Sequence, residues 1–120
     1  MDNINIQAIP KYEKPKKYFF IKVGSSTVKV SISEIKFIEG LKDYIKIHIN
    51  NHSLVTKCTI KHIEKELPNT LFTRVHKSYI ISIDKIDKIE YNHVHIGQKS
   101  IPIGMQFKDS FYTTIDQYRL

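Results

Sequence analysis

The 120-residue chain contains one cysteine, no tryptophan and only four glycines. The single cysteine, Cys58, excludes an internal disulfide and any zinc site built on several cysteines. The sequence also lacks the roughly 18 consecutive apolar residues that a membrane-spanning helix needs. Residues 1–17 have no apolar segment of the kind found in a signal peptide. We therefore expect a soluble, cytoplasmic protein from a reducing compartment, without a membrane role.

Acidic residues are scarce as well. Twelve Asp and Glu residues stand against 19 Lys and Arg, which gives a formal net charge of +7. Hydrophobic residues make up 41% of the chain and charged residues 26%, and these are values typical of a globular domain. The length suits one domain with a core of its own. The basic excess favours a polyanionic partner such as nucleic acid.

Composition divides the chain into two parts. Residues 1–17 hold Pro10, Pro15 and four lysines and show little periodicity, which indicates a linker or N-terminal arm. Residues 18–120 form the expected domain. We also expect this arm to follow a preceding portion of a longer protein.

Short segments of alternating polarity dominate the domain. Val28, Val30 and Ile32 alternate with polar residues, and a similar alternation runs through residues 44–49. This period of two predicts strands, and their close spacing predicts antiparallel pairing in a mainly β fold. The predicted strands cover residues 18–23, 28–32, 35–39, 44–49, 54–57, 72–76, 88–91, 94–96 and 100–103.

Two segments follow a helical period instead. Thr59 is a suitable N-cap for a short helix over residues 59–67, which ends at Pro68. Near the C-terminus, residues 107–118 place Phe107, Phe111, Ile115 and Tyr118 at helical spacing. The segment 83–86 predicts a single helical turn that leads into a strand.

Signatures of catalysis and metal binding are missing. His93 and His95 share one face of a predicted strand, but no third ligand at a recognisable spacing completes a zinc site. Cys58 ends an apolar strand, where we expect a buried and unreactive thiol. The glycines are scattered, so no phosphate-binding loop is predicted. We therefore expect no enzyme activity, no cofactor and no metal.

Residues 72–81 are the most informative stretch. Arg74, His76, Lys77, Ser78 and Tyr79 place five hydrogen-bonding side chains within six positions. Arginine binds guanine or phosphate through a planar fork, and lysine and hydroxyl groups commonly bind phosphate. An edge strand that is kept polar against aggregation would show a similar pattern. The spacing alone leaves both readings open.

The same stretch resembles the signature of the LytTR DNA-binding domain, the output module of a class of bacterial response regulators. Residues 35–48 are similar to a second block of that family. Residues 59–67 match its central helix, and residues 83–86 with 101–104 match its closing region. The resemblance extends over about residues 18–115.

This resemblance implies an elongated β-β-β arrangement of small antiparallel sheets, with short helices near residues 59–67 and 107–118. It also implies that loops enter successive major grooves of double-stranded DNA. The first loop would use Lys42 and Tyr44. In the second loop, Arg74 and Lys77 would approach bases, and His76 and Ser78 would support them or contact phosphate.

The third loop, residues 104–108, departs from the family pattern. Many relatives carry an arginine there, whereas this chain has Gln106, which can pair with adenine, and Lys108, which can reach phosphate. Lys57 and Lys61 flank the start of the central helix, where they would bind phosphate together with free N–H groups of the helix.

The resemblance further implies an output domain of a two-component system. It would be monomeric alone and paired on tandem repeated sites, and it would be joined to a receiver domain. A module for RNA or single-stranded nucleic acid remains an alternative, since thirteen Phe and Tyr residues offer stacking surfaces. Against that alternative, we expect most of these aromatic residues in the core. A protein-interaction or ligand-sensing domain is a further alternative.

Overall fold

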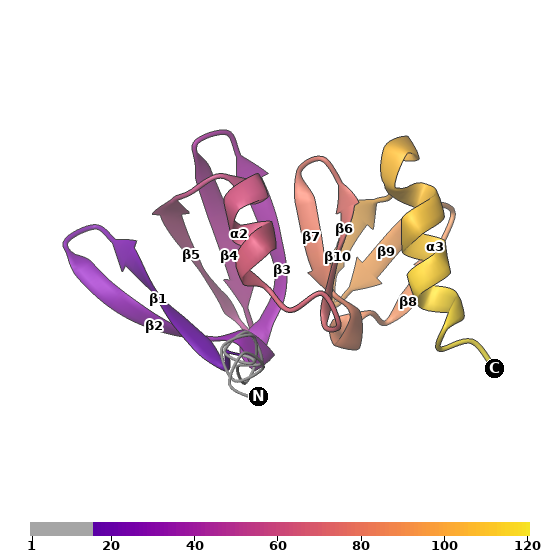
Figure 1. Ribbon diagram of the computed structural model, residues 1–120, viewed down its shortest axis with the longest axis horizontal. Coiled ribbons are helices and arrows are strands. Elements are labelled where there is room, and N and C mark those ends of the chain that lie inside the picture. The colour runs from indigo at the N-terminus through magenta and orange to yellow at the C-terminus, as the bar shows by residue number, and fades with distance from the viewer. Residues whose placement is uncertain (1–15) are drawn as a thin grey trace, which may run out of the picture.

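A computed structural model describes residues 16–120, and this part of the chain is built mainly from strands (Figure 1). The predicted arm falls almost entirely outside the described residues. The strands are β1 (Tyr18–Val23), β2 (Ser26–Ser31), β3 (Ile35–Leu41), β4 (Tyr44–Ile49), β5 (His52–Lys57), β6 (Phe72–His76), β7 (Tyr79–Ser82), β8 (Lys88–Glu90), β9 (His93–Ile96) and β10 (Lys99–Pro102).

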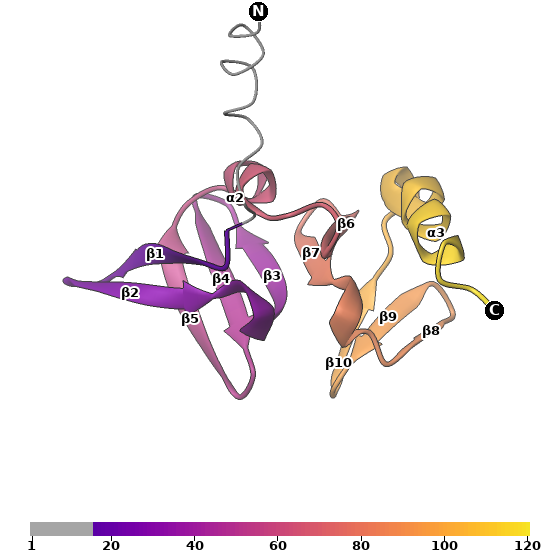
Figure 2. The same ribbon diagram turned by 60° about the horizontal axis from the view of Figure 1, so that its bottom comes forward.

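The strands form three antiparallel sheets that follow one another along the molecule (Figures 1 and 2). β1 and β2 make a two-stranded hairpin, and the central sheet has the order β5-β4-β3-β7-β6. The third sheet has the order β10-β9-β8. The predicted arrangement of small antiparallel sheets is therefore confirmed, and it gives the molecule two long edges on which turns gather.

Two hydrophobic clusters stabilise this arrangement. In β4, Ile45, Ile47 and Ile49 are buried while the residues between them face the other side, as period-two alternation requires. They pack with residues from the β1–β2 hairpin and from the helix after β5. A second cluster joins the central sheet to the third sheet and to the C-terminal helix, with Phe111 fully buried.

Both predicted helices are present. α2 (Ile60–Glu66) begins after Thr59, whose hydroxyl accepts a hydrogen bond from the backbone N–H of His62 at 3.1 Å. α3 (Lys108–Asp116) follows a single 3₁₀ turn. The prediction placed Tyr118 on the apolar face of this helix, but Tyr118 lies after α3 and is 63% exposed.

Two expectations about burial are wrong. Only three of the twelve aromatic residues within 16–120 are buried, namely Phe37, Phe72 and Phe111. The prediction failed because alternation does not show which face of an edge hairpin is covered. Cys58 is only partly buried, although burial still raises the pKa of its thiol and keeps it protonated at neutral pH.

Candidate nucleic-acid interface

Three connections and the start of α2 lie along one long edge of the molecule, the upper edge in Figure 1. They are the β3–β4 turn, the β6–β7 turn and the segment from β10 to α3. Antiparallel pairing places the first two at the same end of the central sheet. The three segments predicted to contact nucleic acid therefore share one surface.

Main-chain hydrogen bonds connect these segments. The N–H of Cys58 donates to the carbonyl of Asp43 at 2.9 Å and joins the β3–β4 turn to the β5–α2 junction. The N–H of Gly40 donates to Ser78 at 2.8 Å, and the N–H of Gly104 donates to Val75 at 2.7 Å. Since each bond crosses between neighbouring segments, the edge is held as one unit.

The first turn presents Lys42 and Tyr44 outward. Lys42 has φ of +67°, a left-handed conformation that costs energy in a residue other than glycine. Tyr44 is 47% exposed and is the cross-strand partner of Lys57 at the end of β5. Lys42, Tyr44 and Lys57 thus form one exposed group at this end of the central sheet.

Arg74 directs its guanidinium into the domain. Nη1 donates to Glu64 Oε1 of α2 at 2.9 Å, and Nε donates to the carbonyl of His76 at 3.1 Å. Nη2 donates to the carbonyl of Lys77. The guanidinium also lies over the ring of Phe107, 5.4 Å from its centroid. Arg74 therefore joins α2, the β6–β7 turn and the third segment.

The β6–β7 turn leaves Lys77 exposed at its tip. The N–H of Ser78 donates to Nδ1 of His76 at 3.1 Å. In neutral His76 this bond places the ring proton on Nε2, which is thereby a donor. Because Arg74 holds the carbonyls of both His76 and Lys77, the position of the Lys77 side chain depends on Arg74.

The third segment exposes Gln106 and Lys108. It approaches β6 closely at Gly104, where an added Cβ would lie 3.4 Å from His76 Cα and from Phe107 Cδ2. At the other side of the edge, Lys61 is exposed on α2. The N–H of His62 already has Thr59 as its partner, so this N–H is not available to a phosphate.

Five lysines on this edge have no ion-pair partner among residues 16–120, and all five are exposed: Lys42, Lys57, Lys61, Lys77 and Lys108. Elsewhere in the described part, Lys16, Lys85 and Lys88 pair with carboxylates, whereas others such as Lys36 and Lys46 also have no ion-pair partner. Unpaired cations along one edge create the positive potential that attracts a polyanion. The arrangement is suited to a chain of phosphates.

Sequence reasoning missed Glu64 and Phe107 as parts of this surface. Both contact Arg74 from other elements, and the spacing of residues within 72–81 contains no information about either one. Gly104 belongs to the predicted third loop, but its close approach to β6 could not be predicted from the sequence.

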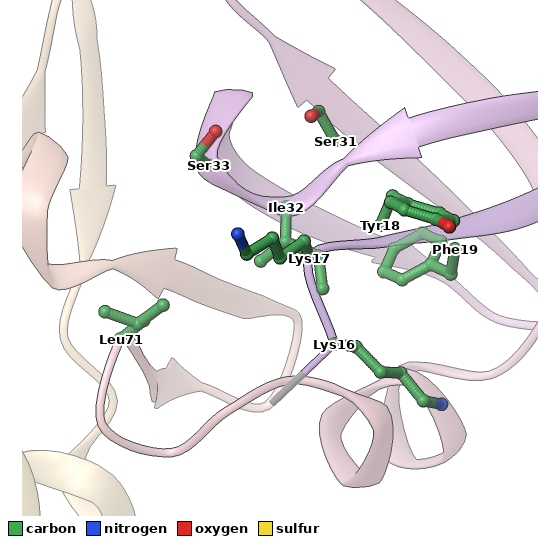
Figure 3. Close-up of a pocket in the computed structure, with 8 residues that line it drawn as sticks. All are labelled: Lys16, Lys17, Tyr18, Phe19, Ser31, Ile32, Ser33 and Leu71. Atoms are coloured by element: carbon green, nitrogen blue, oxygen red, sulfur yellow. The ribbon is translucent and has the colours of Figure 1, made fainter. Parts of the chain in front are cut away.

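No other feature of residues 16–120 indicates a functional site as clearly as this edge does. They contain no group of three His, Cys, Asp or Glu residues able to hold a metal ion. No helix in that range is long and apolar enough to cross a membrane. An open hollow of about 980 Å³ lies at the start of β1, where Lys17, Ile32 and Leu71 line it (Figure 3). Its walls are mostly apolar and hold no charged pair.

Residues 25–116 match the family model of the LytTr DNA-binding domain. This range covers most of the chain and includes all three connections and α2. The chain belongs to the LytTr DNA-binding domain family. The family assignment confirms the resemblance in residues 72–81, and DNA binding is the activity of this class of domain.

Similar proteins agree with the assignment. Sensory transduction protein LytT of Bacillus subtilis is 27% identical over 93 residues, which cover 72% of this chain and 39% of LytT. An uncharacterized response regulatory protein of Vibrio cholerae is 21% identical over 109 residues, which cover 82% of this chain and 42% of that protein. This LytTr domain thus spans about two-fifths of these relatives.

A solved structure shows the same fold. The LytTr DNA-binding domain of a putative methyl-accepting/DNA response regulator from Bacillus cereus superposes with a TM-score of 0.72 at 17% identity. The superposition covers 83% of this chain and 97% of the other.

Proposed function

We propose that this LytTr domain binds double-stranded DNA sequence-specifically by placing its three connections in the major groove. The observation that carries the proposal is the edge itself. Five exposed, unpaired lysines lie on segments that main-chain hydrogen bonds hold together. A preformed cationic edge binds phosphates without the entropic cost of ordering loops, and its turns are narrow enough to approach base edges.

The side chains fall into different roles. Lys77 and Gln106 are exposed at the tips of the second and third segments and read bases. Lys42, Lys57, Lys61 and Lys108 bind phosphates, with Tyr44 packed beside them. His76 donates from Nε2, and Ser78 fixes the His76 ring. Arg74 positions the Lys77 turn, since each of its three side-chain nitrogens already donates to a partner within the domain.

The domain acts as the output part of a transcriptional regulator in a two-component system. In this proposal the remainder of the protein supplies a receiver domain, and the isolated domain is a monomer that pairs on tandem DNA sites. A small domain makes few base contacts, so two copies on neighbouring sites raise specificity. Its partner is chromosomal DNA, which places the protein in the cytoplasm, and the domain itself carries no enzyme activity.

Single-stranded nucleic acid is the second candidate. Tyr18 and Phe20 are 48% and 61% exposed on the outer face of β1, with ring centroids 5.9 Å apart. Exposed aromatic rings stack on unpaired bases. These rings lie on the hairpin, however, while the five lysines of the edge lie on the three connections, the end of β5 and α2, so duplex DNA is favoured.

A competition experiment tests the choice. Equal lengths of duplex DNA, single-stranded DNA and RNA of random sequence compete for the labelled domain at low salt. We expect duplex DNA to be the strongest competitor, and substitution of Tyr18 and Phe20 by serine to leave that order unchanged. Stronger competition by either single strand, lost in the serine variant, would favour the second candidate.

A further inference from the structure

The β1–β2 hairpin has a charge pattern of its own. Residues 16–33 contain four lysines and no Asp or Glu. The match to the family model begins at residue 25, after β1 has ended, so the family assignment gives β1 no role. β1 nevertheless pairs with β2 over its full length, from Tyr18 opposite Ser31 to Val23 opposite Ser26.

The end of β1 lies against the DNA-binding edge. The hydroxyl of Thr56 in β5 donates to the carbonyl of Lys22 at 2.7 Å. Thr56 precedes Lys57, whose cross-strand partner is Tyr44 of the first turn. Lys22 therefore continues the line of cations that runs through Lys57. Lys22 and Lys57 both line one groove of about 770 Å³, together with His62.

Lys22 is the lysine of this hairpin that is free to act at the edge. Lys16 pairs with Glu66 at 2.6 Å, and Lys29 lies over the ring of Tyr18 at 4.5 Å from its centroid. Lys17 lies at the opposite end of β1, where its carbonyl accepts from Ile32. Lys22 is exposed and has no ion-pair partner among the residues that the structure describes.

We propose that the β1–β2 hairpin binds the backbone of duplex DNA that flanks the site read by the three connections, with Lys22 contacting a phosphate. This proposal rests on the proposed DNA-binding function. Exposed Ser25, Ser26 and Thr27 at the hairpin turn supply hydroxyls, which are common phosphate partners. The domain is 55 Å long, so it extends beside about 16 base pairs at ~3.4 Å each.

The test compares duplexes of different length. A duplex selected by the domain is trimmed to the shortest form that keeps specific binding and is then extended at either end by about ten base pairs, one helical turn. We expect extension at one end alone to raise affinity about five- to tenfold at 0.1 M salt, because one more phosphate contact releases about 0.9 counterion. Lys22→Gln removes that gain and leaves binding to the trimmed duplex unchanged.

Lys17→Gln is the matched control. It removes the same charge from the residue just before β1, at the end remote from Thr56, and we expect it to keep the gain. Melting temperatures verify that both variants fold. Equal gains in wild type and Lys22→Gln, or no gain at either end, would overturn the role of the hairpin while leaving DNA binding intact. A wild-type domain that binds no duplex would instead contradict the proposed function.

Discussion

Arg74 has the features of a base reader in the sequence and those of a structural residue in the fold. Its three nitrogen donors all have partners, on Glu64 and on the carbonyls of His76 and Lys77. Hydrogen bonds of this kind stabilise a protein when the charged group is partly buried, and the Arg74 side chain is 18% exposed. Its removal therefore releases the turn that carries Lys77.

We predict that Arg74→Ala lowers the free energy of unfolding by about 1–3 kcal/mol, since charge-assisted hydrogen bonds are lost while Glu64 stays accessible to water. Affinity should fall for specific and random duplexes, and discrimination between them should fall as well, because the turn that carries Lys77 is released. Lys77→Ala is the control, and it should keep stability while losing discrimination between sequences. Urea unfolding and duplex titration measure both. If Arg74→Ala left stability unchanged and lost discrimination at one base position only, Arg74 would itself be a base reader.

His48 lies near the end of β4 remote from the β3–β4 turn, where it lines a hollow with Phe37 and with Ile96 of the third sheet. Its ring stacks on Phe37 with centroids 4.0 Å apart, and Nε2 lies 3.3 Å from Glu39 Oε1. Burial lowers the pKa of His48, and Lys46 and Lys99 lower it further, while Glu39 opposes the shift. The folded state thus binds a proton less readily than the unfolded state does.

Stability should therefore decline on acidification. Where the pKa of a histidine is lower in the folded state, the free energy of unfolding rises with pH, so it falls as the pH drops below about 6.5, the usual histidine pKa. We predict that His48→Gln makes the melting temperature less sensitive to pH between 8 and 5. Melting curves across that range provide the measurement. An unaltered pH profile in the variant would assign the acid sensitivity to another group.

The helix α2 packs closely against β3 at Gly40. A Cβ added at Gly40 would lie 3.2 Å from Ile60 Cβ and 3.3 Å from its Cδ1, closer than ordinary contact. The same glycine donates its N–H to Ser78 in the second turn. Gly40 thus sets the distance between α2 and the sheet, and with it the position of Glu64.

We predict that Gly40→Ala destabilises the domain by about 1–3 kcal/mol, the usual cost of overpacking. Gly104→Ala is a matched control, because its nearest atoms lie at 3.4 Å and the new methyl group fits with less displacement. Neither glycine has a positive φ, so backbone strain does not separate the two variants. Urea unfolding compares the two variants. A larger loss of stability in Gly104→Ala than in Gly40→Ala would contradict the close packing of α2 on Gly40.

The strands could be predicted from the sequence because buried isoleucines alternate with polar residues, as in β4. The caps of α2 could be predicted from Thr59 and Pro68. The burial of the hairpin's aromatic residues could not, because β1 has apolar side chains on both faces and only the tertiary structure decides which face is covered. For the same reason, the partners of Arg74 could not be predicted, since they come from α2 and from the turn before α3.

At the scale of the whole molecule, the unpaired lysines of this edge have a measurable consequence. If Lys42, Lys57, Lys61 and Lys108 each neutralise a phosphate, four contacts form on the trimmed duplex. We predict a slope of log affinity against log salt of roughly −3 to −4, since each contact contributes about −0.9. Titration at several salt concentrations measures the slope. A slope near zero would mean that these lysines remain hydrated and do not contact phosphates.

The most direct test of the central claim is selection of bound duplexes from a random library by the isolated domain. The account predicts enrichment of a shared sequence that Lys77→Ala and Gln106→Ala each relax at different positions, since these side chains read different bases. It also predicts that the enriched duplex outcompetes random duplex at physiological salt. A library that shows no enriched sequence, or an enriched sequence that neither variant changes, would contradict the claim that this edge reads DNA.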